Sequence, residues 1–140
     1  MTKKILSLLR VNNNAQGFEP QRADMQKWLG SLGYQPDEIE WLECVASART
    51  PNTEYSQMLD DIKRLTTDGG IKAVAVWDIT RLGRSKSDLL RLKMFLIEHQ
   101  VQLLVKNPAI KLLNDNGAVS PAANSLFTEC AKMADTELSQ

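Results

Sequence analysis

The sequence predicts an α/β fold, in which a mainly parallel sheet of four or five strands carries helices on both faces and a long C-terminal helix follows. Two observations favour this fold. Short aliphatic and β-branched runs alternate with longer stretches of helical periodicity, the pattern of strands that pair in parallel. The first run, residues 5–11, is almost entirely apolar, as a strand buried on both faces should be. The length, 140 residues, suits one domain with its own core.

The remaining elements follow from the same periodicities and from turn signals. A polar loop over residues 12–17 precedes a helix that Pro20 opens and Gly33 ends. Further strands are predicted at residues 41–45, 71–77 and 101–105, and further helices from 55 to 68 and from about 85 to 100. Residues 107–119 form an irregular segment or a small edge hairpin. Ser120 then caps a last helix, with Pro121 in its first turn.

Composition restricts the kinds of ligand that the chain can bind. Lys and Arg together number 17, as do Asp and Glu, so the formal net charge is zero. A domain that binds nucleic acid by itself usually carries a basic surplus, and any phosphate site must therefore be local. Cys44 and Cys130 have no Cys or His neighbours and are expected to be buried thiols, not metal ligands or a disulfide. No apolar run reaches the roughly 20 residues of a membrane span, and we expect a cytoplasmic protein.

Four arginines lie at the end of a predicted strand or soon after one. Arg10 ends the first strand, Arg49 follows the second, and Arg81 and Arg84 follow the third. Because the carboxyl ends of parallel strands share one edge, where such folds bind ligands, these side chains are predicted to converge. Guanidinium groups match phosphate oxygens two at a time, so the ligand should be anionic. The alternative for an Arg-x-x-Arg pair is an ordinary solvated loop.

Two motifs resemble those of the catalytic domain of the resolvase/invertase serine recombinases, and the resemblance runs from about Lys4 to the last residue. One is Arg10-Val11-Asn12-(three residues)-Gln16-(four residues)-Gln21, against arginine-valine-serine-threonine-x-x-glutamine-x-x-x-x-glutamine in the family. The other is Thr80-Arg81-Leu82-Gly83-Arg84-Ser85, against aspartate-arginine-leucine-glycine-arginine-serine. The resemblance implies that DNA is the substrate, that a serine holds the cut strand as a phosphoserine ester, and that arginines stabilise the transition state. It implies no metal and no other cofactor.

The sequence departs from the family pattern at the residues that carry out the reaction in the family. The family's serine falls on Asn12, whose carboxamide has no hydroxyl to form the ester. The family's loop arginine falls on Asn52, and its aspartate falls on Thr80. The resemblance still implies an active-site set of Arg10, Asn12, Arg81 and Arg84, with Gln16, Gln21 and Arg49 beside the DNA phosphates. Each of these residues also has a purely structural interpretation. Arg10 is compatible with an ordinary strand end, and Asn12 with a turn residue. Gln16 and Gln21 are compatible with a loop and with the first turn of a helix.

The last helix carries an apolar stripe that continues to the final residues. The resemblance implies that this stripe is the interface of a homodimer, formed by Leu126, Phe127, Met133 and Leu138. We accordingly divide the chain into a catalytic domain at residues 1–119 and the start of a dimerisation helix at 120–140, with no DNA-binding module in the sequence. Met133 and Leu138 should be exposed in a single copy, or covered by a second one.

Three functions remain open. The chain is a recombinase domain with an altered nucleophile, a non-enzymatic DNA-associated assembly or regulatory relative, or an unrelated small α/β phosphate-handling enzyme. The third would use Ser47 or Ser85 as its nucleophile, and neither serine has a His or acidic residue beside it to act as the base.

Overall fold

A computed structural model describes residues 4–11, 17–45, 52–68, 70–78, 86–107 and 109–129. The elements are β1 (Lys4–Val11), α1 (Glu19–Ser31), the short 3-10 helix η2 (Pro36–Glu38), β2 (Ile39–Val45), α2 (Asn52–Thr67), β3 (Ile71–Val76), α3 (Lys86–Glu98), β4 (Gln102–Val105) and β5 (Ile110–Lys111). A further helix covers residues 121–129. No helix in these parts of the chain is both long enough and apolar enough to cross a membrane.

The strands form one sheet in the order β2-β1-β3-β4-β5. The first four pair in parallel, while β5 pairs antiparallel with β4. The fold class predicted from the sequence is therefore confirmed. After β1 the chain adds β2 on one side and β3 to β5 on the other, so the direction of sheet growth changes between β1 and β3. A crevice outside the carboxyl ends of two such strands is where open α/β sheets bind ligands.

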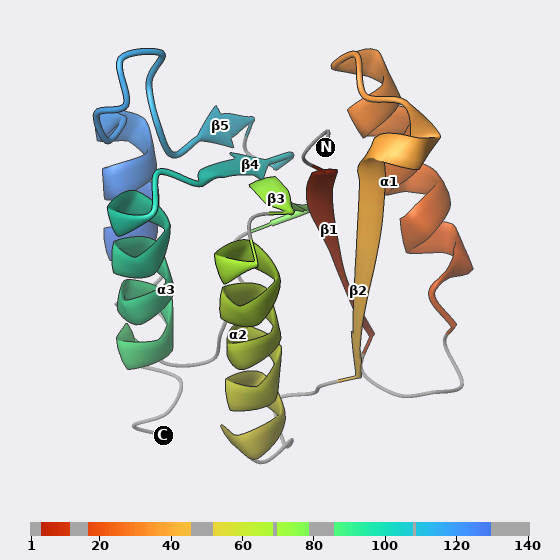
Figure 1. Ribbon diagram of the computed structural model, residues 1–140, viewed down its shortest axis with the longest axis horizontal. Coiled ribbons are helices and arrows are strands. Elements are labelled where there is room, and N and C mark those ends of the chain that lie inside the picture. The colour runs from red at the N-terminus through yellow and green to blue at the C-terminus, as the bar shows by residue number, and fades with distance from the viewer. Residues whose placement is uncertain are drawn as a thin grey trace.

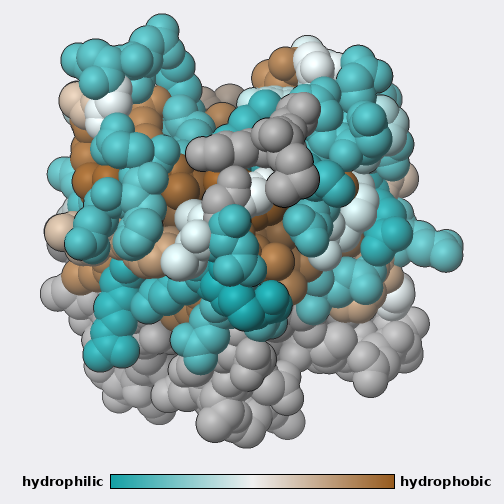
Figure 2. Space-filling view, viewed as in Figure 1, coloured by the Kyte–Doolittle hydropathy of each residue, from teal (hydrophilic) through white to brown (hydrophobic). Residues whose placement is uncertain are grey.

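The helices lie on both faces of the sheet (Figure 1). On one face, Met25 and Leu29 of α1 pack in a cluster with Ile5 and Leu9 of β1. On the other face, α2, α3 and the helix at residues 121–129 contribute to a larger cluster. On the face shown in Figure 2, most of the coloured outer residues are hydrophilic, and hydrophobic residues show in the gaps between them. Because both faces of β1 are covered, residues 5–9 are all buried, as its apolar sequence predicts.

The predicted helix ends are largely confirmed. Gly33 follows the end of α1 with a φ of +100°, a conformation that favours glycine. The Ser120 hydroxyl accepts a hydrogen bond from the Ala123 backbone N–H at 3.2 Å, as a helix cap should.

Two elements begin earlier than predicted. The helix expected from Tyr55 begins at Asn52, and the strand expected from residue 41 begins at Ile39. In β2 the ladder with β1 extends back to the pair Ile5↔Ile39, beyond the apolar run, because Glu40 is tolerated on an edge strand with one unpaired side. Residues 107–119 contain β5 and an isolated bridge between Leu113 and Val119, close to the edge hairpin that was one of the two expectations.

Candidate functional site

Arg10 is the site residue whose position the structure describes most fully. It is the next-to-last residue of β1, lies at the carboxyl end of the strand and is half-buried. On one side it stands in register with Cys44 of β2. On the other side, the last pair between β1 and β3 is Ser7↔Ala75, and β3 ends at Val76. The neighbouring strand therefore stops before it reaches Arg10.

Gln21 of α1 takes the place that β3 leaves open. Its Nε2 donates to the Arg10 carbonyl oxygen at 2.6 Å, and its Oε1 accepts from the Arg10 backbone N–H at 3.1 Å. A carboxamide carries one donor face and one acceptor face, so it pairs with a strand as another peptide group would. These two bonds make Gln21 a positioning residue for Arg10. Its predicted contact with DNA phosphate stays a prediction, because the amide nitrogen keeps a second N–H.

A lysine at the same edge was not predicted from the sequence. Lys106 directly follows β4, and its backbone N–H donates to the Val76 carbonyl oxygen at 3.1 Å. The next residue, Asn107, donates to the Trp77 carbonyl oxygen at 2.8 Å. These bonds fix the turn after β4 onto the end of β3, and the Lys106 ammonium lies 5.6 Å from the centroid of the Trp77 ring. The rule that selected the arginines, a cation just after a predicted strand, selects Lys106 as well.

A small pocket lies between the first half of α1 and the end of β3. Its volume is about 130 Å³, and it is lined by Gln21, Asp24, Met25 and Trp77. Three of these residues come from α1, whose start lies beside Arg10, and the fourth directly follows β3. The pocket therefore opens at the carboxyl end of the sheet, where strand order changes between β1 and β3.

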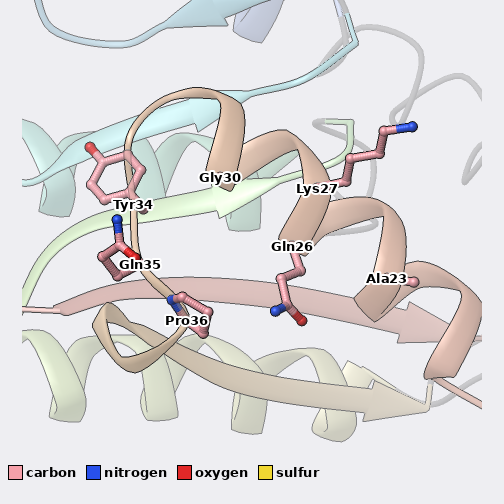
Figure 3. Close-up of a pocket in the computed structure, with 7 residues that line it drawn as sticks. All are labelled: Ala23, Gln26, Lys27, Gly30, Tyr34, Gln35 and Pro36. Carbon is pink, nitrogen blue, oxygen red and sulfur yellow. The ribbon is translucent and has the colours of Figure 1, made fainter.

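A larger hollow, of about 530 Å³, lies along α1 and the turn after it (Figure 3). Gly30 leaves space in its wall, since no heavy atom lies within 4 Å of where a Cβ would stand. In Figure 3 the Lys27 side chain points away from Tyr34 and Gln35, so the polar groups do not converge on one point. A ligand site needs a few convergent polar groups, and we do not take this hollow as the functional site.

Five further predicted site residues lie outside the described residues: Asn12, Gln16, Arg49, Arg81 and Arg84. Arg10 and Gln21 are brought together, while the convergence of the four arginines stays a prediction. Within the described ranges, no group of His, Cys, Asp and Glu side chains is arranged to hold a metal ion.

The apolar stripe of the last helix is partly core. Phe127 is 1% exposed and packs in the main cluster, so its assignment to a dimer interface is wrong for a simple reason: its own sheet covers it. Leu126 is partly buried against the same cluster. Met133 and Leu138 lie outside the described residues.

Comparison with known proteins gives a consistent result. The family model described as "Resolvase, N terminal domain" matches residues 5–139. The N-terminal catalytic domain of TP901-1 integrase has a similar structure, with a TM-score of 0.66, 15% identity and 98% of each chain covered. A resolvase family site-specific recombinase from Streptococcus pneumoniae has a TM-score of 0.64 and 19% identity, with 98% of this chain and 91% of that chain covered. At these identities the two structures show a shared fold. No curated protein matches the chain.

Proposed function

The chain belongs to the family of resolvase N-terminal domains, the domain of site-specific recombinases, and from this premise we propose that it binds DNA phosphates without forming a covalent link to the cut strand. The proposal has two parts, a phosphate site at the carboxyl edge of the sheet and the loss of the nucleophile at Asn12. The placement of Arg10 is the observation that carries the first part.

The phosphate site is supported by how Arg10 is held. Its backbone is bound on both polar atoms by Gln21, and it stands at the strand edge where open α/β sheets bind their ligands. A guanidinium whose backbone is fixed has less freedom to lose when it binds a phosphate, which favours the bound state. Lys106 adds a second cation at the same edge. We propose that Arg81 and Arg84, which follow β3 in the chain, complete this site, with Gln16, Gln21 and Arg49 beside it.

The chemical step is where this chain departs from the resemblance. Strand cleavage through a phosphoserine requires a hydroxyl oxygen that attacks phosphorus while the 3′ or 5′ oxygen of the DNA leaves. The Asn12 carboxamide offers a delocalised nitrogen and a carbonyl oxygen, neither of which forms a stable phosphoester. The arginines stabilise negative charge on the phosphate, but they supply no nucleophile. We therefore propose a domain that is silent in strand cleavage and that acts by binding DNA within a recombinase-type assembly.

Assembly is proposed to use the last helix, with the catalytic-type domain at residues 1–119 and the dimerisation helix from residue 120. Leu126 is partly exposed on this helix, and the proposed homodimer interface consists of Leu126, Met133 and Leu138, without Phe127.

The phosphate site is tested with the variant Arg10→Ala. Binding of the chain to a short DNA duplex is measured by fluorescence anisotropy at several salt concentrations. This binding should be weak, because the net charge of the chain is zero. Each phosphate contact contributes about 0.9 to the magnitude of the slope of log K against log salt. Arg10→Ala should therefore reduce that magnitude by about 0.9, the value for one lost contact. Arg64→Ala is the matched control, because Arg64 lies in the last turn of α2, at the opposite end of the sheet. Equal slopes for the two variants would contradict the proposed site.

A further inference from the structure

We propose that Asn116 is a site of spontaneous covalent modification, at which the side-chain amide is lost and the link to Gly117 becomes in part isoaspartyl. The pair lies in the turn that follows β5, at the edge of the sheet farthest from β2. The inference goes beyond the proposed function, because this turn contains none of the residues proposed to bind DNA.

The chemistry needs only these two residues and water. The Gly117 nitrogen loses its proton to hydroxide and forms a bond to the side-chain carbon Cγ of Asn116, and the Cγ–Nδ2 bond breaks to release ammonia. The product is a cyclic imide. Water then adds to one of its carbonyl carbons, and the bond from that carbon to the nitrogen breaks. Opening at Cγ leaves an aspartate, whereas opening at the main-chain carbonyl leaves an isoaspartate, whose chain continues through Cβ and Cγ.

Gly117 makes this asparagine reactive, and the fold requires glycine at that position. A residue without Cβ leaves the attacking nitrogen and its neighbouring carbonyl uncrowded. Gly117 has a φ of +84°, a conformation that other residues rarely adopt. A Cβ at this position would also stand 2.7 Å from Oε1 of Gln100. The turn therefore keeps an Asn-Gly pair, in which steric hindrance to imide formation is smallest.

The side chain of Asn116 is held near the nitrogen that attacks it. Asn116 is exposed, and its Oδ1 accepts a hydrogen bond from the Ala118 backbone N–H at 3.0 Å. A side chain bonded in this way to the second residue along the chain is folded back over the peptide group between them, here that of Gly117. As the nitrogen adds to Cγ, negative charge develops on Oδ1, and the Ala118 N–H is the donor that stabilises this charge.

One hydrogen bond of the turn opposes the reaction. The Gly117 N–H donates to the Asn114 carbonyl oxygen at 2.9 Å, and this bond must open before the nitrogen can lose its proton. The bond closes a turn in which Asn114, Asp115 and Asn116 are all exposed. Turns with little buried apolar surface open locally at a small part of the global free energy of unfolding. The folded chain should therefore react, but more slowly than the unfolded chain.

The two products affect the edge of the sheet differently. Aspartate keeps an oxygen that accepts from Ala118, and it adds one negative charge to a chain whose net charge is zero. Isoaspartate adds a carbon atom to the main chain between Asn114 and Ala118, whose N–H and carbonyl are bonded at 2.8 Å. That bond and the bridge between Leu113 and Val119 then lose their register. Isoaspartate should therefore loosen the segment that follows β5.

Two other exposed asparagines serve as internal controls. Asn107 precedes Pro108, whose nitrogen carries no hydrogen to lose. Asn124 lies in the helix at residues 121–129, and its Oδ1 accepts a hydrogen bond from Nζ of Lys93. The helical backbone also holds the next nitrogen in a hydrogen bond to the preceding turn. Neither asparagine should convert in the folded chain under conditions in which Asn116 does.

The test is peptide mapping of the full chain by mass spectrometry after incubation at mildly alkaline pH, with a parallel sample unfolded in urea. Asn116 should convert in both samples, more slowly in the folded one, while Asn107 and Asn124 keep their amides in the folded sample. Methylation by a protein isoaspartate methyltransferase identifies the isoaspartyl share. Asn116→Gln should abolish the conversion, because the longer side chain must close a larger and less favourable ring.

Stability distinguishes the two products. The isoaspartyl fraction, separated by chromatography, should unfold at a lower urea concentration than the unmodified chain, whereas Asn116→Asp should unfold at the same concentration. If Asn116 stays unchanged in the folded sample after the urea sample has converted, the proposal is overturned. Conversion of Asn107 or Asn124 at the same rate as Asn116, or of Asn116→Gln at the wild-type rate, would overturn it as well. An isoaspartyl fraction that unfolds like the unmodified chain would overturn the predicted loosening of the edge.

Discussion

Replacing Phe127 with alanine is expected to lower the free energy of unfolding by about 3–5 kcal/mol, the usual cost of removing a buried phenylalanine ring. The side chain is 1% exposed and is among the largest fully buried side chains of the chain. It packs in the cluster formed by β1, β3, β4 and the helices α2 and α3. The loss combines the transfer of the ring from water with the cavity that it leaves. Urea unfolding followed by circular dichroism measures it.

The control for Phe127→Ala is Ser125→Ala, an exposed position two residues earlier on the same helix. It should change the free energy of unfolding by less than about 0.5 kcal/mol. Unfolding is measured at several protein concentrations to distinguish a core residue from an interface residue. Loss of an interface residue changes the free energy of unfolding by an amount that depends on protein concentration, whereas loss of a core residue does not. A small, concentration-dependent effect at Phe127 would return that residue to the dimer interface.

Replacing Gln21 with methionine should destabilise the domain by about 1–3 kcal/mol, because the N–H and the carbonyl of Arg10 lose their partners at a half-buried position. Methionine keeps the length of the side chain and adds no charge. The same substitution at Gln26, an exposed glutamine of α1, is the matched control and should stay within about 0.5 kcal/mol. Thermal or urea unfolding of the two variants gives the comparison.

The positioning role of Gln21 has a second consequence that a purely structural role lacks. Gln21→Met should weaken DNA binding in the wild-type background and have almost no effect on it in the Arg10→Ala background. Such a double-mutant cycle isolates the coupling between the two residues. Additive losses in the two backgrounds would show that Gln21 acts on DNA independently of Arg10.

The fold was predictable because its signals are local. The apolar run of β1 predicts a buried strand from a few consecutive residues, and Ser120-Pro121 predicts a helix start in the same way. The position of Arg10 at a strand end followed directly from the first run.

The role of Gln21 could not be predicted, because it depends on how α1 packs back along β1. The resemblance placed this glutamine near Arg10 in sequence and gave no sign that its amide would replace a strand. Gln102 behaves similarly, since its carboxamide binds both the N–H and the carbonyl of Leu113. In each case a side chain completes a ladder whose geometry exists only in the folded chain.

Phe127 shows a different gap between sequence and structure. An apolar stripe on a helix indicates that one face of the helix is buried. It does not indicate whether that face packs against the chain's own sheet or against a second copy of the chain. The structure assigns Phe127 to the chain's own core. Lys106, in contrast, follows β4 directly, and the reasoning that selected Arg10 would have found it.

The most direct test of the central claim, that this domain binds DNA phosphates without attaching to the strand, is a search for a covalent adduct. The full chain is incubated with a nicked duplex under conditions that trap recombinase intermediates, then denatured and analysed by mass spectrometry. We expect DNA binding that depends on Arg10 and no adduct at any residue, because Asn12 cannot form a phosphoester. An adduct on Ser47, on Ser85 or on any other hydroxyl would contradict the account.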